Sequence, residues 1–196
     1  MTLSNRIQNV SASVTIAITS KAKQMQNDGI DVVSYGAGEP DFDTPQFIKD
    51  AAIEALQAGD TRYVPRQAMA LKTAIAEKLG RENGIDLKPT DVLVTMGGKH
   101  ALYAAFQAIL NPGDKVLLPT PYWVSYPEQI ALAGGVAVPL ETSYETQFKI
   151  TPEQIRQHPD AKVLVLNSPS NPSGQMYSPE ELAALAEAVL ETDMMV

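Results

Sequence analysis

From Asp91 onward, short apolar runs alternate with segments of helical periodicity, and this alternation constrains the fold more than any other feature of the sequence. Runs rich in valine and leucine predict strands at residues 92–96, 115–118, 136–140 and 162–166. Apolar residues spaced three and four apart predict the intervening helices, at residues 101–110, 125–133, 151–157 and 179–190. Strands joined through helices pair in parallel, because a parallel connection must cross over the sheet. We therefore expect an α/β fold of three layers, with a mostly parallel sheet between two layers of helices.

The first ninety residues lack this regular alternation. Residues 1–13 are polar and without periodicity, which is typical of an arm. The elements predicted after the arm are helices at residues 15–25, 45–58 and 71–79 and one strand at residues 31–35. Thr44 and Pro45 stand where the cap and the first turn of the second helix are expected. Further along the chain, Ser178 and Glu181 predict a capping box for the helix at 179–190.

The composition excludes several classes of protein. Acidic side chains outnumber basic ones by 23 to 15, and a net charge of −8 argues against nucleic acid or an anionic membrane as the main partner. The chain has no cysteine, which excludes a disulfide scaffold, a thiolate metal site and a cysteine nucleophile. His100 and His158 lie on different predicted elements without metal-ligand spacing, so we expect no metal site. No apolar run approaches the roughly 18 residues of a membrane span, and we expect a soluble, cytoplasmic protein.

Ligands of parallel sheets bind beyond the carboxyl ends of the strands, and three loops are predicted to gather there. The first loop contains Gly97 and Gly98 at a junction between a strand and a helix. Two glycines allow the backbone to close on an anion, and the helix N-terminus offers free N–H groups and the positive end of the helix dipole. The same glycines would also serve a tight turn without a ligand. The first loop therefore indicates a generic phosphate site or a simple turn.

The other two loops add an aromatic ring and an amide. Trp123, the single tryptophan, follows the strand at 115–118 and would either stack on a planar heterocycle or belong to the core. Asn171 follows the strand at 162–166 and would either donate its amide to a ligand or turn the backbone. An anion cradle, a stacking ring and an amide donor together describe a site for a planar phosphorylated cofactor.

Four motifs of the sequence occur together in one known family. They are GEPDFDTP at 38–45, TRYVP at 61–65, GGK at 97–99 and NSPSNPSG at 167–174. With them the chain resembles the fold-type I pyridoxal-phosphate-dependent aminotransferases of class I/II, and among these the bacterial aspartate aminotransferase branch. The motifs follow the family's order along almost the whole chain and correspond to its N-terminal half. The sequence departs from the family pattern at residues 66–72, which lack a glycine and a proline and are one residue shorter.

The resemblance implies specific roles in binding pyridoxal 5'-phosphate. Backbone N–H groups of Gly98 and Lys99 would bind the cofactor phosphate, and Trp123 would stack on the pyridine ring. Asn171 would donate to the phenolate oxygen of that ring. Tyr63 would reach the phosphate of the neighbouring subunit's cofactor, which implies a homodimer.

The resemblance also implies contacts with the substrate. The backbone of Gly38 would meet the α-carboxylate of the amino acid, and Trp123 and Asn171 would also touch the substrate. The side chain of Lys99 is a candidate for the distal carboxylate of an acidic substrate, because it places a cation beside the site.

The implied activity is the transfer of an amino group between an amino acid, aspartate or glutamate, and a 2-oxo acid. Residues 1–40 would form an N-terminal arm and a segment of a small domain, and residues 41–196 the first part of the cofactor-binding large domain, truncated within a strand that begins near residue 194. No lysine of the chain matches the family's Schiff-base lysine, so no catalytic residue is assigned and the chain alone is expected to be inactive. The alternatives are another fold-type I enzyme, such as a prephenate or aromatic aminotransferase or a carbon–sulfur lyase, and a non-catalytic module.

Overall fold

The computed structural model describes the chain except residues 1, 9, 13, 37, 39 and 63–67. The described residues form two units, one made of residues 1–12 and 96–196 and the other of residues 13–95. Each unit is described by itself.

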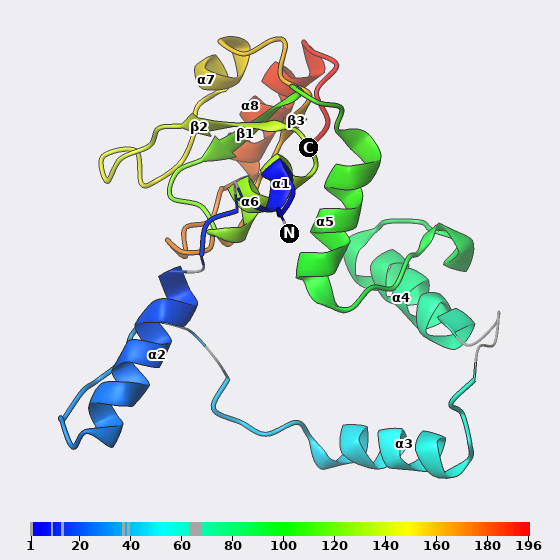
Figure 1. Cartoon of the computed structure of the whole chain (residues 1–196). Coiled ribbons are helices and arrows are strands. Elements are labelled where there is room, and N and C mark those ends of the chain that lie inside the picture. Colours follow the sequence, from blue (N-terminus) through cyan, green and yellow to red (C-terminus); the bar gives the residue numbers. More distant parts are fainter. Residues whose placement is uncertain (1, 9, 13, 37, 39, 63–67) are drawn as a thin grey trace. The chain divides into compact units, whose positions relative to one another are not determined.

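The larger unit contains a parallel sheet of three strands (Figure 1). The strands are β1 (Lys115–Pro119), β2 (Val136–Leu140) and β3 (Val163–Leu164), in the order β2-β1-β3. Met195 forms a parallel bridge with Val163, which confirms that an extended segment begins near the predicted position. The sheet is parallel as predicted, and β3 is shorter than the run at 162–166 suggested.

Helices cover both faces of this sheet, as the alternation predicts (Figure 1). The helices of this unit are α1 (Asn5–Gln8), α5 (Gly97–Ile109), α6 (Ser125–Leu132), α7 (Pro152–Arg156) and α8 (Pro179–Leu190). Successive side chains of β1 point to opposite faces. Val116 and Leu118 pack in one core cluster with residues of α5 and α6, whereas Leu117 packs in a second cluster with residues of α7 and α8.

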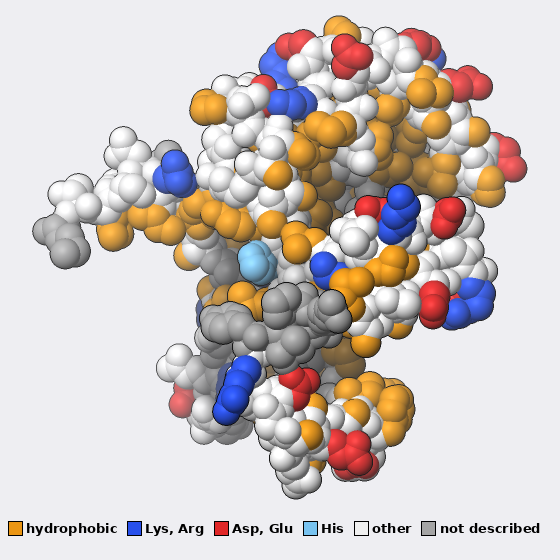
Figure 2. Space-filling model, turned by 90° about the vertical axis from the view of Figure 1, so that its right-hand side faces the viewer, with side chains coloured by type: hydrophobic (Ala, Val, Ile, Leu, Met, Phe, Trp, Pro, Cys, Tyr) orange, Lys and Arg blue, Asp and Glu red, His pale blue; other side chains and the backbone are white. Residues whose placement is uncertain are grey.

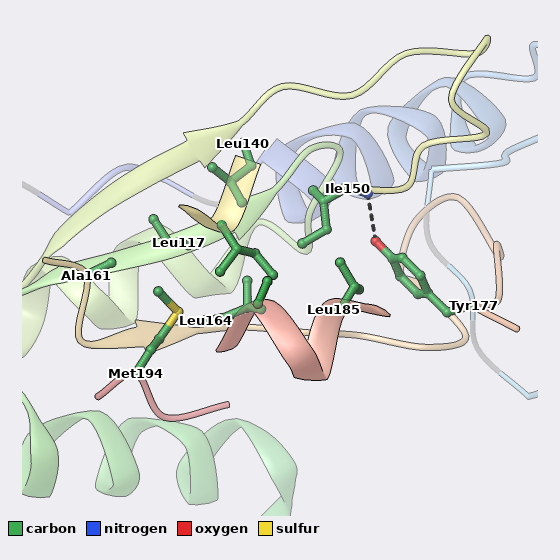
Figure 3. Packing of buried hydrophobic residues seen from close by; sticks show 10 residues of the cluster. Leu117, Leu140, Ile150, Ala161, Leu164, Tyr177, Leu185 and Met194 are labelled. Carbon is green, nitrogen blue, oxygen red and sulfur yellow. Dashed lines mark hydrogen bonds between the residues drawn. The ribbon is translucent and has the colours of Figure 1, made fainter. Parts of the chain in front are cut away.

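The second cluster extends from the sheet to the loop before α7 (Figure 3). Leu117, Leu164 and Leu185 bring β1, β3 and α8 together. At the edge of the cluster, the backbone N–H of Ile150 donates to the hydroxyl of Tyr177 at 3.0 Å. Because that hydroxyl is satisfied, the Tyr177 ring can be buried at little cost.

The start of α8 agrees with its sequence. The backbone N–H of Glu181 donates to Ser178 Oγ at 3.2 Å, and the Ser178 N–H donates to the Glu181 carboxylate at 2.7 Å. This is the predicted capping box, and it satisfies two backbone donors at the helix N-terminus.

The smaller unit is helical in its described part. It contains α2 (Val14–Asn27), α3 (Gln46–Gln57), α4 (Ala68–Asn83) and the short 3₁₀ helix η1 (Pro89–Asp91). The strands predicted at 31–35 and 92–96 are wrong, because neither segment forms a strand of the described sheet. Val92 does have extended dihedral angles, φ −98° and ψ 125°. Its apolar neighbours therefore indicate extended backbone, but a strand also requires a partner for its hydrogen bonds.

The described surface carries charged side chains of both signs. On the face drawn in Figure 2, acidic and basic side chains are interspersed, and no large patch is basic. None of the helices that the structure describes is both long and apolar enough to cross a membrane.

The ion pair between Lys149 and Glu181 generates a prediction for the pH dependence of stability. Lys149 Nζ lies 2.9 and 2.8 Å from the two carboxylate oxygens. Hydrogen bonds from Lys149 and from the Ser178 backbone lower the pKa of Glu181 from its ordinary value near 4.5. A lowered pKa stabilises the fold above the ordinary value, and this contribution is lost as the pH falls through the folded-state pKa.

We therefore expect the unfolding free energy of Lys149→Gln to fall less than that of the wild type when the pH is lowered from about 5 to about 3. Urea denaturation across this range measures it. The control is Lys23→Gln, because Lys23 is exposed on α2 and has no ion pair among the described residues. Parallel pH profiles of the wild type and Lys149→Gln would contradict the prediction.

Candidate cofactor site

Parallel pairing places two of the predicted loops at one edge of the sheet. β1 pairs in parallel with β3, with Val116 opposite Val163 and Leu117 opposite Leu164. Both strands therefore end on the same side, and the loops that follow them contain Trp123 and Asn171.

A pocket of about 410 Å³, including its open mouth, lies where these loops meet. It is lined by the end of β1, by Tyr122 and Tyr126 near the start of α6, and by Asn167 and Asn171 after β3. Burial raises the pKa of Tyr126, so this phenol is neutral at physiological pH. The lining of the pocket therefore combines apolar and aromatic side chains with amide groups.

The turn that begins α5 contains two glycines in different surroundings. Gly97 has φ +82°, a conformation that side chains with a Cβ rarely adopt. A Cβ placed on Gly98 would meet no heavy atom within 4 Å among the described residues. The positive φ therefore explains why residue 97 is a glycine. The packing of the described residues does not require a glycine at position 98.

The start of α5 has no side-chain cap. Met96 occupies the N-cap position, and methionine has no oxygen that could accept from the first N–H groups of the helix. The first turn of a helix carries N–H groups without intrahelical partners and the positive end of the helix dipole. Open space at Gly98 beside an uncapped helix end fits a phosphate group, so the residues present agree with the phosphate of the implied cofactor.

Lys99 connects this turn with the aromatic loop. Its Nζ lies 5.1 Å from the centroid of the Trp123 ring, a cation–π contact. The Trp123 ring also meets Tyr126 in an edge-to-face arrangement, with centroids 5.4 Å apart and planes at 87°. The Lys99 ammonium group therefore lies over one face of the Trp123 ring.

The backbone of Asn171 makes a hydrogen bond within its loop, whereas its side chain makes none with the described residues. The Asn171 N–H donates to Asn167 Oδ1 at 2.8 Å, so Asn167 forms the turn. The exposed Asn171 side chain has no hydrogen-bond partner among the described residues. Sequence reasoning missed Asn167; two asparagines four residues apart around a proline were the signal that one could turn the loop for the other.

Of the predicted site residues in the larger unit, Lys99 contacts Trp123, and Asn171 lines the pocket. Gly38 is exposed and belongs to the unit of residues 13–95, so its role stays a prediction. Tyr63 lies outside the described residues, as do Arg66 and Gln67 of the departing segment. In the part of the chain that the structure describes, no group of three or more His, Cys, Asp or Glu side chains could hold a metal ion.

Comparison with known proteins defines the class. The model of the family "aminotransferase class I and II" matches residues 30–196. The chain therefore belongs to the class I and II aminotransferase family.

Individual relatives narrow the comparison. The chain is 50% identical to an aspartate aminotransferase of Bacillus sp. (strain YM-2), over 99% of this chain and 50% of the relative. It is 48% identical to the aspartate/prephenate aminotransferase of Thermus thermophilus, over 97% of this chain and 50% of the relative. The solved structure of the Thermus thermophilus aspartate aminotransferase with maleate matches with a TM-score of 0.93 and 47% identity, covering 100% of this chain and 52% of that one. The chain thus spans about half the length of the curated relatives it matches.

The two glycines of the α5 turn are expected to respond differently to alanine. Gly98→Ala should keep or raise the unfolding free energy, by up to about 1 kcal/mol, because alanine is the better helix former. It should nevertheless weaken binding of pyridoxal phosphate, because the new methyl group enters the open space. Gly97→Ala should destabilise the fold by about 1 kcal/mol or more through its positive φ.

Urea denaturation and fluorescence titration with pyridoxal phosphate measure the two effects for both variants. Gly98→Ala that binds pyridoxal phosphate as tightly as the wild type would show that the space at Gly98 does not receive the phosphate.

Proposed function

We propose that this chain forms the phosphate- and ring-binding part of an aminotransferase that uses pyridoxal 5'-phosphate. The reaction moves an amino group between an amino acid, aspartate or glutamate, and a 2-oxo acid. The observation that supports this best is the uncapped turn of α5 with open space at Gly98, in a chain that is 50% identical to an aspartate aminotransferase.

Four residues of the larger unit would hold the cofactor. The backbone N–H groups of Gly98 and Lys99 would donate to the phosphate, Trp123 would stack on the ring, and the Asn171 amide would donate to the ring oxygen. When bound, pyridoxal phosphate supplies an electron-withdrawing ring that weakens bonds at the amino acid's α-carbon. The chain's own residues bind and orient that ring. Tyr63 would contact the cofactor of a second subunit.

No lysine of the chain matches the position at which the family attaches the cofactor. We therefore expect the chain alone to bind pyridoxal phosphate reversibly and to be inactive, and no residue of it is proposed as catalytic. The division into residues 1–40 and 41–196, the homodimer and a cytoplasmic location stay predictions.

The positive charge of Lys99 is the basis on which we propose an acidic substrate. Lys99 lies beside Trp123, so a modest change of its side chain would direct the ammonium group toward an acidic substrate. Gly38, Trp123 and Asn171 would contact the rest of the amino acid. A related structure contains maleate, a dicarboxylate, which supports an acidic substrate.

A prephenate or aromatic substrate is the second candidate. It is supported by relatives named aspartate/prephenate aminotransferase and by a related tetra mutant complexed with tryptophan. The aromatic side chains of Tyr122 and Tyr126 that line the pocket suit such a substrate.

Substitution of Lys99 tests the activity and the substrate class together. In the catalytically competent protein that carries this sequence, we expect amino transfer from aspartate to 2-oxoglutarate. Lys99→Ala should lower kcat/KM for aspartate by about tenfold or more, the value of losing one charge-assisted hydrogen bond, with little change for alanine or phenylalanine. Steady-state kinetics with the three amino acids measures it.

Lys115→Ala is the matched control, because Lys115 pairs with Asp160 at the opposite end of β1. An equal loss for all three amino acids would remove Lys99 from substrate recognition. Absence of amino transfer by the wild type would overturn the proposed function itself.

A further inference from the structure

Apart from tyrosines, Gln129 is the one polar side chain that is buried in the described structure. It lies on α6 between the buried Tyr126 and Ile130 and is only 5% exposed. Its Nε2 donates to the backbone carbonyl of Lys99, in the first turn of α5, at 2.8 Å. A side chain from a neighbouring helix thus reaches the turn that we propose binds phosphate.

The other polar atom of this side chain has no partner. Oε1 of Gln129 is buried and makes no hydrogen bond with the described residues. A buried acceptor without a partner costs free energy that an apolar side chain at this position would avoid. The bond from Nε2 to Lys99 is therefore the interaction that explains a glutamine here.

That bond acts on the orientation of the turn. A carbonyl and the next N–H share one rigid peptide plane and point in opposite directions. Met96 is the N-cap of α5, so the His100 N–H donates to the Met96 carbonyl, and fixing the Lys99 carbonyl steadies this first intrahelical bond. The neighbouring peptide between Gly98 and Lys99 is restrained through the shared Cα of Lys99. This restraint matters most beside Gly98, which has the greatest backbone freedom.

We propose that Gln129 is a positioning residue, which orients the N–H groups of the α5 turn for the phosphate of a cofactor. The proposal rests on the proposed function, because it concerns the same phosphate site. A positioning role differs from a purely structural one in a measurable way. Loss of Gln129 should weaken binding of a ligand that carries the phosphate and leave binding of the same ligand without it unchanged.

The chain offers a matched control for this role. Gln107 of α5 donates from Nε2 to the carbonyl of Leu132 in α6, at 3.2 Å. Both glutamines therefore link α5 to α6 by one amide-to-carbonyl bond, but only Gln129 reaches the first turn of α5. Gln107 is exposed and lies in the third turn of that helix.

The experiment measures Kd for pyridoxal phosphate and for pyridoxal, which lacks the phosphate, on the full chain. Gln129→Met keeps the size of the side chain and removes the donor. We expect its Kd for pyridoxal phosphate to rise about tenfold, as for loss of one well-placed hydrogen bond, with its Kd for pyridoxal unchanged within about twofold. Gln107→Met should leave both values unchanged.

Gln129→Glu is the second variant, because it keeps the shape and replaces the amide donor by an acceptor. It should show the same selective loss at neutral pH, and circular dichroism checks that each variant is folded. The proposal is overturned if both Gln129 variants lose the two ligands equally, if they retain the wild-type ratio of the two Kd values, or if Gln107→Met shows the same selective loss. A wild type that does not prefer pyridoxal phosphate to pyridoxal overturns the proposed phosphate site, and the role of Gln129 with it.

Discussion

The burial of β1 is the interaction on which the rest of the larger unit depends. Val116, Leu117 and Leu118 have no exposed surface, and they contribute to core clusters on both faces of the sheet. Full burial of side chains of this size contributes about 1.5–3 kcal/mol each. Because β2 and β3 both pair with β1 in parallel, the same strand sets the direction in which the loops leave the sheet.

The candidate site follows from this arrangement. The loops after β1 and β3 meet at one pocket, and α5 packs in the cluster formed by Val116 and Leu118. The first turn of α5 is then joined to the aromatic loop by Lys99 and to α6 by Gln129. The flexible glycine turn is thus held by contacts on both sides, while the space beside Gly98 remains open. A turn held in place at a helix N-terminus, with space beside its backbone, suits the binding of a compact anion.

The sequence predicted the parts of this structure that local patterns determine. The helix α8 begins where predicted because Ser178 and Glu181 form its cap, and β1 and β2 follow their runs of valine and leucine. The prediction of a strand at 92–96 was wrong because strand formation depends on a partner strand elsewhere in the fold. Thr44 was expected to cap α3, whereas Pro45 occupies the N-cap position without a side-chain bond. The bond from Gln129 to Lys99 joins residues thirty positions apart, and only the packing of two helices reveals it.

Binding of a phosphate at the start of α5 is most directly tested by the backbone amide shifts of the chain. Titration with pyridoxal phosphate, followed by ¹⁵N NMR, should shift the amides of Gly98, Lys99 and His100 most, and pyridoxal should shift them much less. Large shifts elsewhere, with these three amides unchanged at saturation, would contradict a phosphate site at this turn.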